Sequence, residues 1–303
     1  MKTKILRNLL LSLGAIFALT ITAPAQNLYV SVNGAVCGFQ CSDFSGSISE
    51  YTPDGMQSTF ASELARPRGV VFDSSGNLVA AVNLLGPPNQ RHGRILKFPP
   101  VGHQSVLGNV ALSTIEDLVT DSAGNTFALA QSASDTLGDI SNIYKFAPDG
   151  TRTLFGSIPN TGGFGLALDS AGNLYAADAD DQTIYKFAPD GTQSVFAGPS
   201  AFGDSAPIDL TFDSGGNLFV STEGDPGNDT ILGFTPDGSE STFAAGLNNP
   251  RGLAFDSFGN LFVAESNAAP DGDILKFALG GGAPTVFASG IDAPEFLTFG
   301  PPR

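Results

Sequence analysis

The feature that most constrains this chain is an internal repeat of about 46 residues. Six segments begin with Asn and continue as an alternating apolar run, which is the pattern of a half-buried β-strand. The segments begin at Asn27, Asn77, Asn125, Asn173, Asn217 and Asn260, with spacings of 50, 48, 48, 44 and 43 residues. A strand-rich unit repeated at this period predicts one array of repeats rather than two ordinary domains.

Each repeat contains two turn motifs. The last five Asn residues close the sequences DSSGN (73–77), DSAGN (121–125 and 169–173), DSGGN (213–217) and DSFGN (256–260). A second turn follows, most clearly in IYKFAPDGTRTLF (143–155) and IYKFAPDGTQSVF (184–196). Asp, Gly and Asn suit tight turns, and Pro-Asp-Gly between alternating runs is a hairpin signal. We therefore expect four strands per repeat: A before the DSxGN turn, B after it, and C and D around the second turn.

The two ends of the array complete each other. The repeats begin directly at a B-like strand (27–32) and end on an A-like strand (296–299). Together these two strands would complete one unit. The sequence therefore predicts an all-β, six-bladed β-propeller with four antiparallel strands per blade, whose ring is closed by pairing of the N- and C-terminal strands. A seven-bladed ring is the main alternative.

The segment PRGLAFDSFGNLFVA (250–264) resembles the NHL repeat, and related segments cover essentially the whole repeat region. The wider pattern is similar to the propellers of the senescence-marker-protein and gluconolactonase family. This resemblance implies a six-bladed propeller. Its motifs consist mostly of turn and core positions, so they specify the fold more than the function.

The first 25 residues have the features of a signal peptide. Lys2, Lys4 and Arg7 precede an apolar run of 13 residues (9–21), which is too short to span a membrane, and Ala23-Pro24-Ala25 follows. We expect residues 1–25 to be the signal peptide and residues 26–303 to form a single propeller domain. The mature protein is then secreted or periplasmic, is not inserted in a membrane, and is a monomer.

Charge and cysteine content narrow the partners and the compartment. The leader holds three of the 14 basic residues and none of the 30 acidic ones, so the mature chain carries a net charge of −19. Such an acidic chain repels phosphate backbones, which disfavours nucleic acid as a partner. The only two cysteines, Cys37 and Cys41, lie four residues apart. In an oxidising compartment they are expected to form a local disulfide.

Strand direction divides the predicted disc into two faces. The DSxGN and Pro-Asp-Gly turns share one face, the turn face, and the B–C loops and D–A connections share the other, the loop face. The turns are nearly identical between repeats whereas the loops vary, so we expect binding on the loop face. Residues at the starts of the A strands should surround the channel mouth there: Glu295, Arg68, Glu116, Phe164, Ile208 and Arg251, with Asp117 and Asp209 beside them. The ends of the B strands add Asn33, Asn83, Gln131, Asp178, Glu223 and Glu265 to the same face.

The charges at this mouth alternate in sign. Arg251, Glu295, Arg68 and Glu116 belong to four adjacent blades, so we expect Arg–carboxylate pairs that close the mouth. Asp117 is the strand neighbour of Glu116 and is expected to point to the opposite face unless the strand is irregular there.

The family resemblance implies a metal-dependent lactonase, in which Glu, Asn and Asp hold one divalent cation, Ca²⁺ or Mg²⁺, at the channel mouth. Glu116, Asp209 and Glu295 are the possible ligands. The chain departs from that pattern, because Phe164 and Ile208 stand where further ligands would be expected. A His-ligated zinc is disfavoured, since the sequence contains only His92 and His103, on opposite faces.

The remaining hypothesis is a module that binds a glycan, a peptide or a cell-surface protein through the loop face. Arg68 and Arg251 beside Phe164 and Ile208 would give a mixed charged and apolar recognition patch. Phe164 and Ile208 could equally cap the core. The sequence favours this binding module, and the metal-dependent lactonase or esterase is the alternative.

Overall fold

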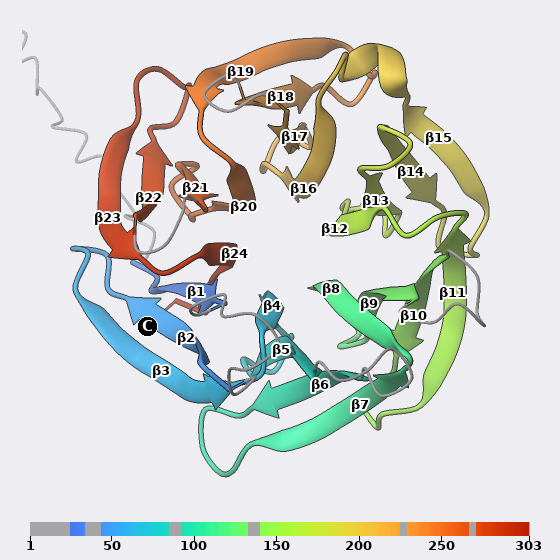
Figure 1. Ribbon diagram of the computed structural model, residues 1–303, viewed down its shortest axis with the longest axis vertical. Coiled ribbons are helices and arrows are strands. Elements are labelled where there is room, and N and C mark those ends of the chain that lie inside the picture. Colours follow the sequence, from blue (N-terminus) through green and yellow to red (C-terminus); the bar gives the residue numbers. More distant parts are fainter. Residues whose placement is uncertain are drawn as a thin grey trace, which may run out of the picture.

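The structure is a computed structural model that describes residues 25–33, 44–84, 92–132, 140–224, 229–266 and 271–302. Within these ranges the strands form six separate four-stranded antiparallel sheets, which surround a central channel as blades (Figure 1). The predicted six-bladed propeller is confirmed. The described part also contains a short 3₁₀ helix, η2 (Pro199–Ala201). None of its helices is long and apolar enough to cross a membrane. The leader up to residue 24 and both cysteines lie outside the described residues.

We number the blades along the ring from the one that joins the chain ends. The innermost strand of blades 1 to 6 is the A strand: β24 (Pro294–Phe299), β4 (Pro67–Phe72), β8 (Ser113–Thr120), β12 (Gly163–Leu168), β16 (Ala206–Phe212) and β20 (Pro250–Phe255). The B strands follow outward: β1 (Leu28–Val32), β5 (Leu78–Leu84), β9 (Thr126–Ser132), β13 (Leu174–Asp178), β17 (Leu218–Glu223) and β21 (Leu261–Glu265).

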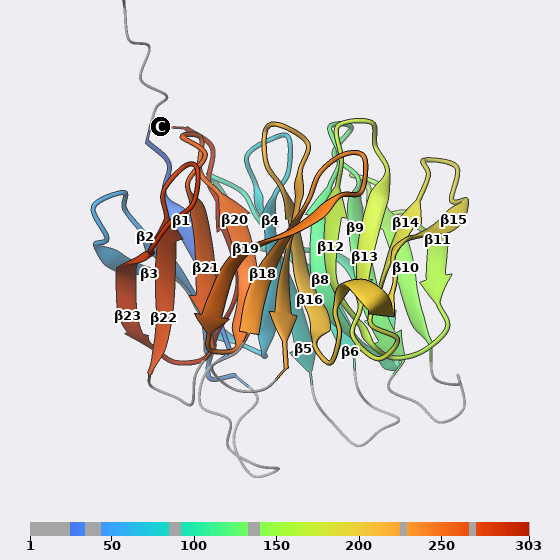
Figure 2. The ribbon, with the colours of Figure 1, turned by 90° about the horizontal axis from the view of Figure 1, so that it is seen from above.

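The C and D strands complete each blade toward the rim. The C strands are β2 (Gly46–Tyr51), β6 (His92–Phe98), β10 (Ser141–Phe146), β14 (Thr183–Phe187), β18 (Asp229–Phe234) and β22 (Gly272–Phe277). The outermost D strands are β3 (Gln57–Leu64), β7 (Ser105–Ala111), β11 (Arg152–Ile158), β15 (Gln193–Ala197), β19 (Glu240–Leu247) and β23 (Thr285–Ile291). Figure 2 shows the disc from its side, with the hairpin turns of the turn face on the upper side.

The two ends of the chain close the ring in blade 1, as predicted. Strand β24 pairs antiparallel with β1, so that Leu28 lies opposite Phe299. The backbone N–H of Gly300 donates to the carbonyl of Asn27 at 2.9 Å, which extends the pairing beyond the strands. Sheet closure therefore satisfies the backbone of both terminal strands.

The DSxGN turn is held by its Asp side chain. In the first copy, Asp73 Oδ1 accepts hydrogen bonds from the backbone N–H groups of Ser75 and Asn77, both at 2.9 Å, and from the Asn77 side chain. Gly76 has φ of +77°, a conformation that glycine adopts without a steric penalty. These contacts explain why Asp, Gly and Asn recur at fixed places, and the motif is structural.

The hydrophobic core lies between the blades in six clusters rather than in the centre of the disc. The A strand of one blade packs against the B strand of the preceding blade. In one example, Phe255 meets Phe219 edge to face with ring centroids 5.0 Å apart. Such pairs add to the apolar burial, and they explain the high Phe content. Both faces of each inner strand are thus covered by neighbouring blades, and its edge faces the channel.

Candidate functional site in the central channel

Every A strand carries a register shift near its loop-face end, at the same level of the channel. Such a bulge re-aims the side chain that it carries. The residue that follows the mouth position at each shift, which we call the bulged residue, is in blades 1 to 6 Phe296, Gly69, Asp117, Gly165, Asp209 and Gly252; in blade 3 the unpaired residue is Glu116, and Asp117 pairs with Leu129 directly after it. Glycine therefore alternates with a larger residue around this ring, which we call the neck.

The glycines are required by the close approach of the strands at the neck. A Cβ atom on Gly252 would lie 2.5 Å from the carbonyl oxygen of Glu295 and 2.7 Å from Cα of Phe296. A Cβ on Gly69 would lie 2.6 Å from Cα of Asp117, and Gly165 is placed in the same way. These distances exclude any side chain. Of the bulged residues, only those of blades 1, 3 and 5 therefore contribute side chains to the neck.

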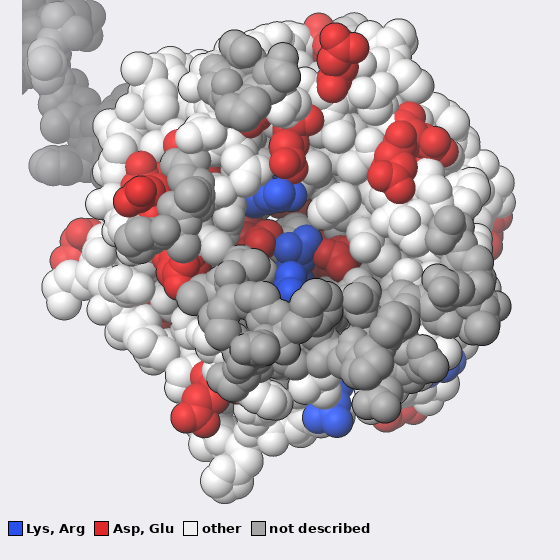
Figure 3. Space-filling view, in the orientation of Figure 1, with Lys and Arg blue, Asp and Glu red and all other residues white. Residues whose placement is uncertain are grey.

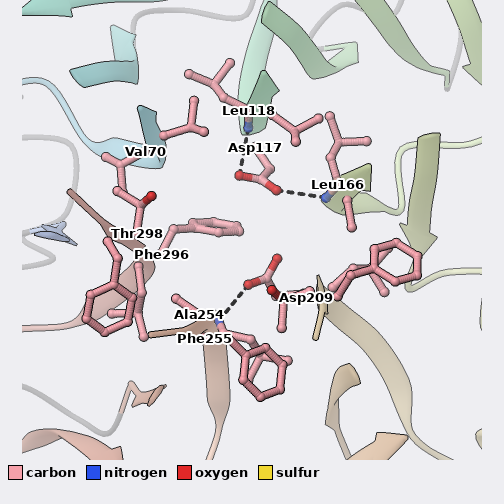
Figure 4. Close-up of a pocket in the computed structure, with 18 of the residues that line it drawn as sticks. Val70, Asp117, Leu118, Leu166, Asp209, Ala254, Phe255, Phe296 and Thr298 are labelled. Carbon is pink, nitrogen blue, oxygen red and sulfur yellow. Dashed lines mark hydrogen bonds between the residues drawn. The ribbon is translucent and has the colours of Figure 1, made fainter. Parts of the chain in front are cut away.

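Two of these side chains are carboxylates that connect neighbouring blades. Asp117 accepts hydrogen bonds from the backbone N–H of Leu118 at 2.7 Å and from that of Leu166, in blade 4, at 2.8 Å. Asp209 accepts one from the backbone N–H of Leu253, in blade 6, at 2.7 Å. Figure 4 shows both carboxyl groups directed toward the middle of the channel, beside Phe296.

The two neck carboxyl groups hold protons more tightly than ordinary Asp side chains. Each residue is 4% exposed. Burial raises the pKa of Asp117 well above its usual value, and the nearby Asp209 raises it further, against the opposing effect of the backbone N–H donors. Burial also raises the pKa of Asp209, to about 7. The pair therefore retains protons at pH values where an exposed Asp has lost its own.

A cavity of about 410 Å³ extends from the neck toward the turn face. Asp117, Asp209 and Phe296 line its inner end, and Gln26 and the phenylalanines at the ends of the A strands line its outer end. Gln26 is held there, because its side chain donates to the carbonyl of Gly300 at 2.7 Å. The described lining contains no Lys, Arg or His.

On the loop-face side, Arg68 lies between two glutamates. Its Nη2 atom is 2.6 Å from Glu116 Oε2, and its Nη1 atom is 3.0 Å from Glu295 Oε2. Burial disfavours the charged guanidinium, but the two carboxylates outweigh this effect, so the pKa of Arg68 lies above its ordinary value. The guanidinium carbon also lies 5.7 Å from the ring centroid of Phe296. Arg68 therefore closes the neck from the loop face.

Arg251, the other arginine of the mouth, has a different partner from the one that the alternating charges predicted. Its Nη2 atom lies 3.1 Å from Glu223 Oε2 rather than beside Glu295. Glu295 faces Arg68, whereas Glu223 ends the adjacent B strand of blade 5. This pair is more open than the Arg68 cluster, with side chains 20% and 40% exposed. Figure 3 shows basic side chains at the centre of the loop face with acidic ones around them.

Several residues predicted for the mouth serve the scaffold. Asn83 exchanges two hydrogen bonds of 2.8 Å with the backbone of Ile115 in the next blade. Asp178 accepts from the Asn160 side chain, and Glu265 accepts from the backbone N–H of Asn248. Burial raises the pKa of both Asp178 and Glu265. These side chains satisfy backbone and loop donors, so they are not free to bind a ligand.

The remaining predicted mouth residues include the two apolar ones and the Glu116–Asp117 pair. Ile208 is buried, which matches a core-capping position, and Phe164 is half-buried. Glu116 contacts blade 2 through Arg68, and Asp117 contacts blade 4 through Leu166. The neighbours point in opposite directions as expected, although the strand is irregular there.

Phe296, Gln26 and the alternation of the neck were not recognised from the sequence. A signal was present: the residue after each mouth position is Phe, Gly, Asp, Gly, Asp and Gly in ring order. That column becomes meaningful only when the bulge is known, because a regular strand would turn these residues into the blade rather than toward the channel.

The arrangement does not fit one divalent cation held jointly by Glu116, Asp209 and Glu295. The Arg68 guanidinium already lies between the two glutamates, and Asp209 belongs to the neck. In the described part of the chain, no three His, Cys, Asp or Glu side chains are grouped so that they could hold a metal ion.

The fold and the channel define the chain as a six-bladed β-propeller whose channel is narrowed at a neck. No family model and no curated protein sequence matches it, so the NHL resemblance stays a prediction. Similar solved structures include a protein of unknown function from Bacteroides caccae, with a TM-score of 0.62, 11% identity, and coverage of 91% of this chain and 99% of that one.

Other similar structures are of enzymes, and they include the following two. A gluconolactonase from Xanthomonas campestris has a TM-score of 0.58 and 20% identity, over 73% of this chain and 77% of the other. A catalytically inactive variant of virginiamycin B lyase from Staphylococcus aureus has a TM-score of 0.57 and 16% identity, over 79% of this chain and 76% of the other. At these identities the similarity establishes the fold alone.

Proposed function

We propose that this protein is an exported binding module that recognises a glycan, a peptide or a cell-surface protein through its loop face. The observation that carries the proposal is the position of Arg68. Its guanidinium occupies the space between Glu116 and Glu295, where the family resemblance would place a catalytic cation. A site that is filled by an arginine side chain of the same protein is suited to structure and recognition rather than to Lewis-acid chemistry.

The groups available for recognition lie around this closed mouth. Arg251 and Glu223 are partly exposed and form a pair that a polar partner could enter, and Phe164 adds an apolar surface on a neighbouring blade. Arginine and aromatic residues are enriched among the residues that dominate binding energy. The net charge, −16 for the full chain and −19 without the leader, favours a neutral or basic partner at long range.

Binding to glycan and peptide arrays tests this proposal. Arg251→Ala and Phe164→Ala are each expected to weaken binding of the selected ligand by about tenfold or more. Arg152→Ala is the matched control, because Arg152 lies on an outer strand, where its side chain donates to the carbonyl of Asn109. Equal loss in all three variants, or no loss in the first two, would place recognition elsewhere.

The lactonase remains the second candidate, since gluconolactonases have this fold. It requires that Arg68 leave at least one of its glutamates when a metal binds. The metal content of the protein separates the two functions.

A further inference from the structure

The cavity between the neck and the turn face is a second concave feature, separate from the loop-face mouth. Its inner end is made by Asp117, Asp209 and Phe296, and Arg68 and Glu116 do not line it. A volume of about 410 Å³ is within the range of small-molecule sites. The proposed loop-face function does not use this cavity.

The charge at the inner end of the cavity has no dedicated counter-ion. Asp117 and Asp209 are both buried, and the described lining residues include no basic side chain. The charge of Arg68, on the loop-face side, favours the ionised form of Asp117, but its guanidinium is paired with Glu116 and Glu295. Two buried carboxyl groups that face one channel and have no ion-pair partner of their own are an unfavourable arrangement that a positively charged ligand relieves.

Hydrogen bonds from the backbone orient the two carboxyl groups, but they do not fill all the acceptor positions of the carboxyl oxygens. Asp117 receives two backbone donors, and a carboxylate has about four acceptor positions. Leu253 donates to the second carboxyl, that of Asp209. The remaining lone pairs face the channel, where a group with several N–H donors could bridge the two side chains.

The walls favour a slender ligand. The six inner strands run along the channel and present their backbone edges to it, while their side chains pack between blades. Phe296 adds an aromatic ring beside the carboxyl groups (Figure 4). A methylene chain that ends in an ammonium group matches a narrow channel whose inner end carries two carboxyl groups and an aromatic ring.

We propose that this cavity binds a small linear primary amine, with its ammonium group between Asp117 and Asp209 and its alkyl chain directed toward the turn face. Recognition combines charge-assisted hydrogen bonds to both carboxyl groups with packing of the alkyl chain beside the Phe296 ring. The ligand class is defined by its end group and width, so branched or quaternary ammonium compounds are excluded.

Calorimetric titration of the mature protein with n-butylammonium chloride tests the proposal. Saturable binding is expected at millimolar concentration. n-Butanol and tetramethylammonium should not bind, because one lacks the charge and the other lacks N–H donors. Binding should strengthen between pH 5 and pH 8, since Asp209, whose pKa is about 7, ionises over this interval while the amine stays charged. Loss of binding toward pH 8 would overturn the proposal.

Two variants with matched loss of charge complete the experiment. Asp209→Asn should weaken butylammonium binding at least tenfold, whereas Glu240→Gln at an exposed position of the outer strand β19 should leave it unchanged. Asp117→Asn provides an independent test if the first variant folds poorly by circular dichroism. The proposal is overturned if neither neck variant changes the affinity, if butanol binds equally well, or if no saturable heat appears. If butylammonium does not bind, the proposal of loop-face binding through Arg251, which the arrays test, is not affected.

Discussion

Replacing Arg68 with Met is expected to lower the free energy of unfolding by about 3 kcal/mol at pH 7. The substitution keeps a long side chain over Phe296 but leaves Glu116 and Glu295 buried, close together and without their cation. Urea unfolding followed by circular dichroism measures the loss. Two uncompensated buried carboxylates are among the few single-site defects of this size.

Further variants identify the cause of that loss. Combining Arg68→Met with Glu116→Gln and Glu295→Gln should restore most of the stability, because the whole charged cluster is then removed. Arg251→Ala, in the more exposed pair, should cost no more than about 1 kcal/mol. An equal loss in Arg68→Met and Arg251→Ala would contradict the buried cluster.

Asp209→Asn is expected to stabilise the protein at pH 8 by about 2 kcal/mol. The pKa of Asp209 is raised to about 7 in the folded protein, above the ordinary value of 3.8 that applies to the unfolded chain. The folded state therefore binds more protons between these two values. Consequently, wild-type stability falls as the pH rises from about 4 through about 7, and the amide variant should lose this part of the dependence.

A second substitution separates ionisation from hydrogen bonding. The amide oxygen of Asn can still accept from the backbone N–H of Leu253, whereas Asp209→Ala leaves that donor without its acceptor. The Ala variant should therefore be less stable than wild type at pH 4, where the Asn variant should be nearly equal to it. Thermal unfolding at pH 4, 6 and 8 measures all three proteins. If the stability of wild type rose between pH 4 and pH 8 relative to that of Asp209→Asn, the raised pKa of Asp209 would be contradicted.

Much of the fold could be predicted because its signals are local and repeated. The five DSxGN turns place strands on both sides, and the first B strand, predicted over 27–32, spans Leu28–Val32. Ring closure followed from the unmatched strand types at the two ends, and β24 does pair with β1. Each of these features depends on the residues that tight turns require and on the alternation of apolar and polar residues along a strand.

The site was predicted less completely, because it depends on contacts between blades. The charge alternation around Arg68 could be read from the repeat alignment, and the Arg68 pairs follow from it. The partner of Arg251 could not be read in this way, because Glu223 lies on another strand type. The neck was missed because one extra residue per inner strand redirects Asp117 and Asp209, and regular alternation does not reveal a bulge.

The metal content of the mature protein tests the central claim most directly, namely that Arg68 rather than a metal ion occupies the loop-face mouth. Elemental analysis after purification without chelator or affinity metal should find no stoichiometric Ca²⁺, Mg²⁺, Zn²⁺ or Mn²⁺, even after addition of millimolar Ca²⁺. One tightly held ion per chain that is lost in Glu116→Gln or Glu295→Gln would contradict the claim, and would direct the search to lactones and other esters.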